Sequence, residues 1–295
     1  MLTTIIGILE EGFAYALLAL GVYITYKILD FPDLSVDGTF PLGGAVTVVL
    51  ITAGVNPLLT LLLSFLTGAI AGVITGVIHV KFKVRDLLSG IIVMTALYSI
   101  NLRIAGSANV PIFSKESIFD NSFFDRVIPD GFRPYLVMTV LLIIVVTMKV
   151  LLDFYLRTKS GYLLRAVGDN ETVVTSLAKD KGIVKIIGLA IANAFVALSG
   201  GIFAQKNGYF DITIGTGALV TGVASVIIGT NLFRKLTIMK TTTAVVIGVV
   251  LYKACVAIAI ALGLEAQDQK LITSVLFLVI LITSNEKKRR TRANA

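Results

Sequence analysis

The chain has 295 residues, of which 56% are hydrophobic and 15% charged, and its mean hydropathy is +0.91. Soluble domains carry about 25% charged residues, so the composition excludes an ordinary soluble enzyme and favours a protein embedded in a membrane. The formal net charge of +8 is distributed over short segments between apolar runs and over the C-terminal tail. That distribution indicates membrane topology and membrane lipid as the neighbour, rather than nucleic acid.

Apolar runs close to the ~20 residues that a helix needs to cross a bilayer recur along residues 1–285. The second and the last run are short, which predicts partial crossings or a locally thinned bilayer. The sequence therefore predicts an all-α fold, a polytopic membrane helix bundle of about nine spans. Residue 2 onward is expected to be a retained helix, because a basic flank and a cleavage site are missing. The expected spans are 3–26, 39–54, 57–79, 87–106, 134–156, 184–205, 213–231, 237–262 and 270–284.

Lysine and arginine residues outside these spans gather mostly on one side, which predicts an outside N-terminus and an inside C-terminus. On that topology, residues 107–133 form an external loop, residues 157–183 a cytoplasmic loop, and residues 286–295 a basic cytoplasmic tail. Spans two to four and spans seven to nine have a similar order of Gly-rich, basic and acidic features. Their opposite orientation suggests an inverted repeat of the kind found in transporters.

Several polar side chains fall inside the predicted membrane region, where burying a charge is costly. Glu10 and Glu11 lie in the first span, and two interpretations remain open for them. Either they line a path or pair with a cation such as Lys253, or the span begins near residue 12 and both acids reach the outer interface. The residues that we expect along a translocation path are Glu11, Tyr15, Asp33, Asp37, Asn101 and Lys253.

The roles of three of these polar residues are less specific. Asp33 and Asp37 are four residues apart on a segment flanked by glycine and proline, where they serve in gating or packing, or equally as cap and turn residues. Asn101 is of a type that more often joins helices by hydrogen bonds than contacts a ligand.

Three glycines of the third predicted span repeat every four residues, which predicts close helix packing. They are Gly68, Gly72 and Gly76.

The cytoplasmic loop contains a short segment with the signature of an amphipathic helix. Asn170 is a good N-cap, Glu171 places an acid in the first turn, and Val174 and Leu177 share one face. Lys181 is expected in the last turn, with Gly182 after it as a helix stop. Such a helix either lies on lipid headgroups or docks into a groove of a cytoplasmic partner.

The motifs around this segment are similar to those of a known family. The cytoplasmic loop and a following stretch resemble ABC importer permeases of the branched-chain amino acid and ribose type, as does the first span. Further stretches are similar to the subgroup that accompanies binding proteins for tryptophan or tyrosine. The stretches are GYLLRAVGDNE at 161–171, LSGGIFAQ at 198–205, GFAYALLALG at 12–21, DLSVDGTFPLG at 33–43, GYFD at 208–211, GTG at 215–217 and ASVIIG at 224–229.

This resemblance implies a set of partners around the chain. They are a second permease copy, two cytoplasmic ATPase subunits bound at the inner loop, and an extracytoplasmic substrate-binding protein. A phosphate-binding loop of the Gly-x-x-x-x-Gly-Lys-Ser/Thr type does not occur in the sequence, so ATP and Mg are expected on the partner subunit, with no cofactor in this chain. The ATPase-coupling residues are expected to be Arg165, Gly168, Asn170, Glu171, Val174, Leu177, Lys181 and Gly182.

Together with this resemblance, these observations predict a multi-pass permease subunit of an ATP-driven ABC importer in the bacterial plasma membrane. Its solute is expected to be an amino acid, and an aromatic amino acid is a candidate. The permease is expected to form a homodimer. Catalytic residues and a metal site are not expected, because His79 and Cys255 lie in separate spans without further ligands. The alternative is a secondary transporter coupled to an ion gradient.

Overall fold

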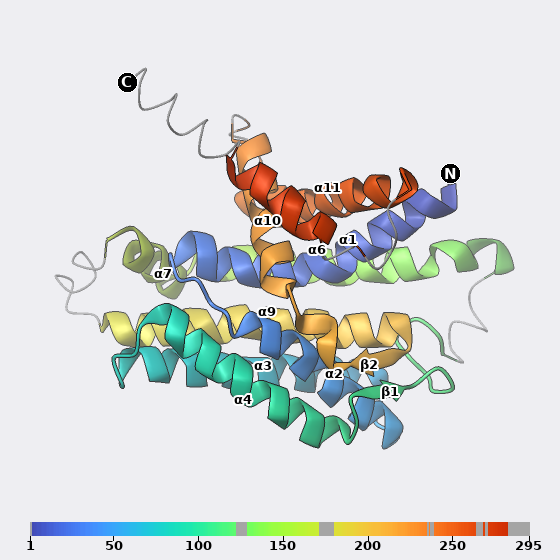
Figure 1. Cartoon of the computed structure of the whole chain (residues 1–295), viewed down its shortest axis with the longest axis horizontal. Helices are drawn as coiled ribbons and strands as arrows, with labels where there is room; N and C mark the ends of the chain where they lie inside the picture. The colour runs from blue at the N-terminus through green and yellow to red at the C-terminus, as the bar shows by residue number, and fades with distance from the viewer. Residues whose placement is uncertain are drawn as a thin grey trace.

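The structure, a computed structural model, describes residues 2–121, 129–170, 180–234, 236, 239–263, 268 and 271–282. It is a bundle of helices, most of which run in one common direction (Figure 1). Within the described residues, seven helical segments are long and apolar enough to cross a membrane, and Val36–Thr52 and Leu271–Ile282 are shorter apolar helices. The predicted all-α polytopic fold is confirmed, whereas the number of crossings, their orientation and the inverted repeat stay predictions.

The first half of the chain supplies helices that begin and end at recognisable signals. Asn56 caps the third helix by accepting from the Leu58 N–H, with Pro57 at its first position. Gly106 ends the fourth helix with a left-handed φ of 76°, a conformation that glycine adopts without strain. The elements are α1 (Leu2–Val22), the π-helical turn η1 (Tyr23–Ile28), α2 (Val36–Thr52), α3 (Pro57–Val80) and α4 (Asp86–Ala105).

The second half adds further helices and one small strand pair. β1 and β2 are antiparallel, with Val110 opposite Phe210, and they join two segments that are distant in sequence. The elements are β1 (Asn109–Pro111), η2 (Asp130–Phe132), α6 (Arg133–Tyr155), α7 (Lys159–Asp169), α9 (Lys181–Asn207), β2 (Tyr209–Asp211), η3 (Ile212–Gly215), α10 (Ala218–Leu232) and α11 (Thr241–Ala261). The helix Leu271–Ile282 follows them.

Helix α9 lies at the centre of the bundle and contacts α1, α2 and α3. A Cβ atom at Gly72 of α3 would clash with the Leu189 carbonyl oxygen of α9, and one at Gly68 would clash with the Asn193 carbonyl oxygen. The predicted glycine face on α3 is therefore confirmed as a close helix contact. Gly43 of α2 approaches the backbone of α9 in the same way, so the three helices are in contact through their main chains.

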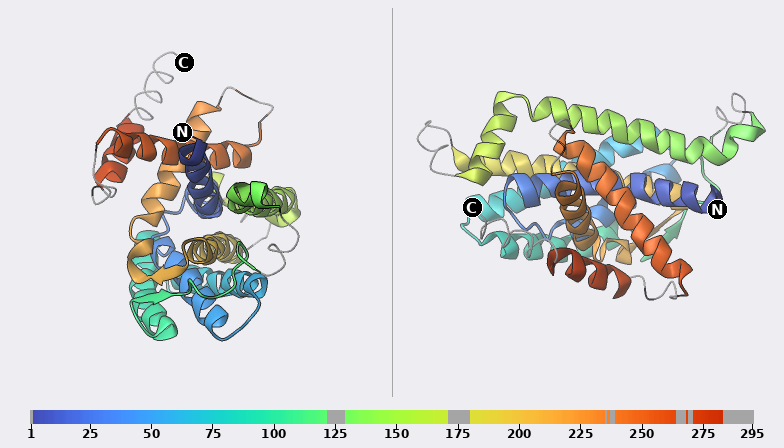
Figure 2. Two further views of the ribbon diagram at one scale, coloured as in Figure 1. Left: turned by 90° about the vertical axis from the view of Figure 1, so that its right-hand side faces the viewer. Right: turned by 90° about the horizontal axis from the view of Figure 1, so that it is seen from above.

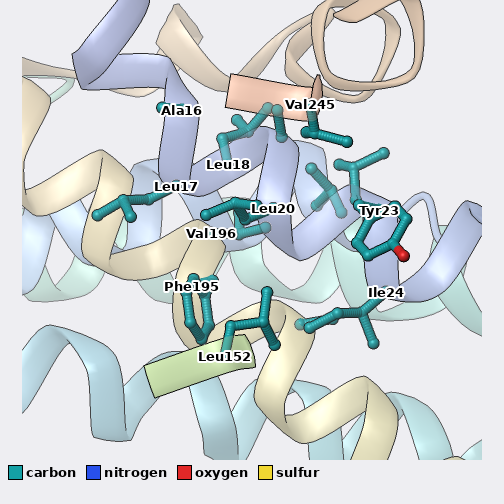
Figure 3. Close-up of a cluster of buried hydrophobic side chains, with 14 of the residues drawn as sticks. Ala16, Leu17, Leu18, Leu20, Tyr23, Ile24, Leu152, Phe195, Val196 and Val245 are labelled. Carbon is teal, nitrogen blue, oxygen red and sulfur yellow. The ribbon is translucent and has the colours of Figure 1, made fainter. Parts of the chain in front are cut away.

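Helix α1 packs against the opposite side of α9. Its residues Leu17, Leu18 and Leu20 are fully buried, and they belong to the same buried cluster as Val196 of α9 and Val245 of α11 (Figure 3). Close packing of this kind stabilises helix pairs in a membrane, where lipid is as apolar as the side chains. Helix α1 thus stands between the α2–α3–α4–α9 group and the helices near the C-terminus (Figures 1 and 2).

Helix α10 runs across the common direction of the other helices (Figures 1 and 2). It begins beside α2 and η3 and reaches the α11 region, where glycine allows a close approach: a Cβ at Gly229 would clash with the Ala244 carbonyl oxygen. The segment predicted as the span 213–231 is therefore helical, but it links the two groups of helices instead of lying parallel to them.

Some of the connections between helices lie together at either end of the bundle, whereas the connection before α2 reaches the start of α10, where Asp37 accepts from the Gly217 N–H. At one end, a Cβ at Gly168 would clash with the Ile28 carbonyl oxygen, and one at Gly182 would clash with Val80. At the opposite end, Gln205 Nε2 donates to the Pro57 carbonyl oxygen at 3.0 Å, and the Ile118 N–H donates to Gln205 Oε1 at 2.8 Å.

Candidate functional site

A cluster of charged side chains lies inside the bundle where α1, α9 and α11 meet. Lys206 of α9 forms an ion pair with Glu11 of α1, at 2.5 Å from Oε1, and Lys253 of α11 approaches Glu11 Oε2 at 3.5 Å. Lys253 is only 9% exposed. The interpretation in which Glu11 pairs with a cation such as Lys253 is confirmed. Lys206, which directly follows the predicted span 184–205, is a second partner. Paired charges are the form in which ionised groups persist inside membranes.

Tyr15 extends this cluster toward aromatic side chains. The Lys253 ammonium lies 3.6 Å from the centre of the Tyr15 ring, a cation–π contact. The Tyr15 ring also stacks on Phe40 of α2 with centroids 5.5 Å apart, and it forms an edge-to-face pair with Phe203 of α9. Three residues expected on the path, Glu11, Tyr15 and Lys253, therefore lie together.

Tyr15 and Lys253 border a cavity of about 430 Å³, a volume in the range of small-molecule sites. Its wall combines aromatic rings, hydroxyl groups and one cation, and includes the start of α10. Lining residues are Tyr15, Phe203, Tyr252, Lys253, Thr216 and Thr221. An arrangement of this kind provides a surface for the aromatic ring of a ligand and hydrogen-bonding groups for its polar atoms.

Asp37 joins two helix N-termini. It lies in the first turn of α2, and its carboxylate accepts from two backbone donors at the start of α10: the Gly217 N–H at 3.1 Å and the Leu219 N–H at 2.8 Å. A carboxylate at this position satisfies N–H groups that a helix start leaves without partners and interacts favourably with its dipole. Of the roles predicted for Asp37, packing and capping describe these contacts.

Asp33 takes part in a different network. It is fully buried, its Oδ1 accepts from the Ser35 N–H and hydroxyl at 2.9 and 2.6 Å, and its Oδ2 accepts from Asn193 Nδ2 at 2.8 Å. The connection between η1 and α2 is thereby fixed to α9. Asp33 and Asp37 bind separate donors, so their contacts are those of two structural anchors.

Asn101 lies beside a second cavity of about 430 Å³, which Asp37, Tyr98 and Thr213 also border. Asn101 is buried, and its Nδ2 donates to the Gly38 carbonyl oxygen of α2 at 3.0 Å. This bond between helices α4 and α2 matches the helix-joining role. Asn101 is not among the residues that line the Lys253 cavity. Thr213 of η3 and Thr216, the C-cap of η3, border both cavities.

The predicted coupling loop begins with a helix that the sequence analysis missed. Helix α7 is capped by Thr158, which accepts from the Gly161 N–H. It buries Leu164 and Val167 and exposes Tyr162 and Arg165. The capping residue and the apolar spacing from 161 to 167 were available signals.

The remaining coupling residues are placed only in part. Asn170 is the C-cap of α7 in an extended conformation, while Glu171, Val174 and Leu177 lie outside the described residues. The expected last turn at Lys181 and helix stop at Gly182 were wrong: both residues belong to the first turn of α9, because the Asp180 side chain accepts from the Gly182 N–H and starts that helix. Their coupling role stays a prediction. Gly168 packs against the end of η1.

A second polar centre, near α7, was also missed. Asp153 of α6 accepts from Lys149 at 2.8 Å, Lys240 at 3.0 Å and the Thr242 hydroxyl at 2.6 Å. The four-residue spacing of Lys149 and Asp153 was a readable signal for their pair. Within the part of the chain that the structure describes, His, Cys, Asp and Glu side chains form no group of three that could hold a metal ion.

Comparison with known proteins identifies relatives over nearly the whole chain. A family model described as the permease component of a branched-chain amino acid transport system matches residues 4–284. A protein named tyrosine transport system permease protein, from Clostridioides difficile (strain R20291), is 42% identical over 291 residues, which cover 99% of this chain and 95% of the relative. An uncharacterized protein of Rickettsia prowazekii (strain Madrid E) is 29% identical over 281 residues, covering 94% and 96%. No solved structure matches the chain.

Proposed function

Because the chain belongs to the family of permease components of branched-chain amino acid transport systems, we propose that it carries an aromatic amino acid of the tyrosine type. It is the membrane subunit of an ABC amino acid importer in the bacterial plasma membrane, and it is not itself an enzyme. The observation that carries the aromatic substrate is the 42% identity, along 99% of the chain, to a permease named for tyrosine transport. The three aromatic rings around the Lys253 cavity support the same substrate class.

The energy for transport comes from a separate ATPase, and a substrate-binding protein belongs to such a system. Our proposal assigns two ATPase subunits, with their ATP and Mg, to a pair of permease copies. Family membership therefore disfavours the alternative of an ion-coupled secondary transporter.

Helix α7 is the element through which the ATPase is proposed to act. Its exposed face carries Tyr162 and Arg165, while Gly168 on its packed side contacts Ile28 at the end of η1. Leu164 meets Gly188 of α9 on the same packed side. A displacement of α7 would thus be transmitted to α9 directly and to α1 through η1, and these two helices carry Glu11, Tyr15, Phe203 and Lys206.

The test is uptake of labelled amino acids by proteoliposomes that contain the full chain, its ATPase and its binding protein. We expect ATP-dependent uptake of tyrosine, tryptophan or phenylalanine, with leucine transported much less well. Preferential uptake of leucine would overturn the aromatic substrate. Uptake by the chain alone, driven by an ion gradient and independent of ATP, would overturn the proposed mode of energy coupling.

A further inference from the structure

Lys253 presents a buried ammonium group whose bonding capacity is only partly used. It lies in the middle of α11, is 9% exposed and borders the 430 Å³ cavity. An ammonium group has three donors, and the contacts described for Nζ are Glu11 Oε2 at 3.5 Å and the face of the Tyr15 ring. A distance of 3.5 Å is long for a bond between an ammonium and a carboxylate.

Glu11 does not fully compensate Lys253, because it is shared. Its Oε1 pairs with Lys206 at 2.5 Å, a full ångström closer than the approach of Lys253 to Oε2. Charge-assisted bonds are strongest at short range, so the stronger hydrogen bond of Glu11 is the one to Lys206. Among the described residues that line the cavity, aspartate and glutamate are absent, so the cavity has a positive charge without a negative one on its wall.

The rest of the cavity suits the other parts of an aromatic amino acid. Tyr15, Phe203 and Tyr252 provide ring surfaces, and Thr216 and Thr221 provide hydroxyl groups. Aromatic rings pair favourably with one another in offset or edge-on geometries. The position, where a helix starts inside the bundle and near the middle of α1 and α11, is one at which transporters place substrates.

We propose that this cavity is a substrate site of the permease itself, in which the Lys253 ammonium binds the carboxylate of the amino acid in exchange for Glu11. The inference rests on the proposed aromatic substrate. Glu11 remains paired with Lys206 during the exchange, so the carboxylate of Glu11 and the carboxylate of the substrate each keep a cationic partner. The Glu11 contact also limits affinity, because it competes with the substrate, and a transport site must release what it binds.

The test uses the purified full chain in lipid nanodiscs, without ATPase or binding protein, and two fluorine-labelled probes. One probe is 3-fluoro-L-tyrosine, and the other is 3-fluorotyramine, which lacks the carboxylate. We expect ¹⁹F line broadening to show binding of fluorotyrosine, and fluorotyramine to bind about 10- to 100-fold more weakly, as for loss of one charge-assisted hydrogen bond. Equal binding of the two probes to the wild-type chain would overturn the proposal without recourse to any variant.

Two substitutions have opposite expected effects. Lys253→Met should weaken fluorotyrosine binding to the level of fluorotyramine, whereas Glu11→Gln should strengthen it severalfold by removing the competing carboxylate. Lys149→Met, which removes a lysine from α6 outside the cavity, is the matched control and should bind as wild type does. If Glu11→Gln weakens binding as much as Lys253→Met does, the two residues form a structural pair and the exchange is wrong. ATP-driven tyrosine uptake with no difference between the probes would refute this site alone, while absence of tyrosine uptake would refute the function on which it rests.

Discussion

The contact of Asp37 with the start of α10 can be tested by Asp37→Asn, which keeps the size of the side chain and removes its charge. In the wild-type chain, the carboxylate accepts from the N–H groups of Gly217 and Leu219. An asparagine has one oxygen for these two donors, so its amide group would face one N–H without bonding to it. The start of α10 therefore loses one hydrogen bond and the charge at its N-terminus.

The expected loss of stability follows from these contacts. A hydrogen bond to a charged group contributes about 1.5–3 kcal/mol, and a neutral one about 0.5–1.5 kcal/mol. Burying an amide is less costly than burying a carboxylate, which offsets part of the loss. We expect Asp37→Asn to lower the free energy of unfolding by about 2 kcal/mol, which corresponds to roughly 3 °C in Tm for a chain of this size.

The assay is thermal unfolding of the purified chain in detergent, followed by circular dichroism, with Asp86→Asn as the control. Asp86 also lies in the first turn of a helix, but among the described residues its carboxylate accepts from the neighbouring Leu87 N–H, in an exposed setting. Its replacement should change stability by about 0.5 kcal/mol or less. Equal Tm values for the two variants would show that Asp37 does not hold α10, and the account of that contact would have to be withdrawn.

Two further substitutions test the packing of α9 and the role of α7. Gly72→Ala should destabilise the chain by about 1–3 kcal/mol, because its Cβ would clash with Leu189. In the control Gly7→Ala, the added atom meets no neighbour within 4 Å, so the Tm should stay unchanged or rise. Similar Tm values for the two variants would contradict the close contact between α3 and α9. Arg165→Glu on the exposed face of α7 should lower ATP-driven uptake by about tenfold or more at unchanged Tm, and normal uptake would remove Arg165 from the interface with the ATPase.

The helical positions were predictable from the sequence because membrane helices are specified by long apolar runs. The expected spans 57–79, 87–106 and 134–156 each agree with the corresponding helix within a residue or two at either end. The direction of α10 was not predictable, since an apolar run specifies a helix but not its angle. That angle depends on Asp37 and on the contact of Gly229 with α11, which connect residues far apart in sequence.

The polar centres were predictable only where one partner stood out. Glu11 and Lys253 were conspicuous as charges in apolar runs, and their pairing was proposed from that alone. Lys206 was assigned to a loop because it follows the apolar run of α9, although the helix continues through Asn207. The boundary at residues 180–182 was misjudged for a similar reason: a glycine after lysines is as compatible with a first helical turn as with a stop.

The crosswise course of α10 has a mechanical consequence. One end of this rod is held by Asp37 to α2, which is locked to α3 and α9 through main-chain contacts, and the other end is held by Gly229 to α11. Because α10 is attached at both ends, a tilt of one group of helices is transmitted through α10 to the other group. We therefore expect the two groups to rotate together about α10. The Lys253 cavity lies at the start of α10, so a small rotation would change the shape of the cavity.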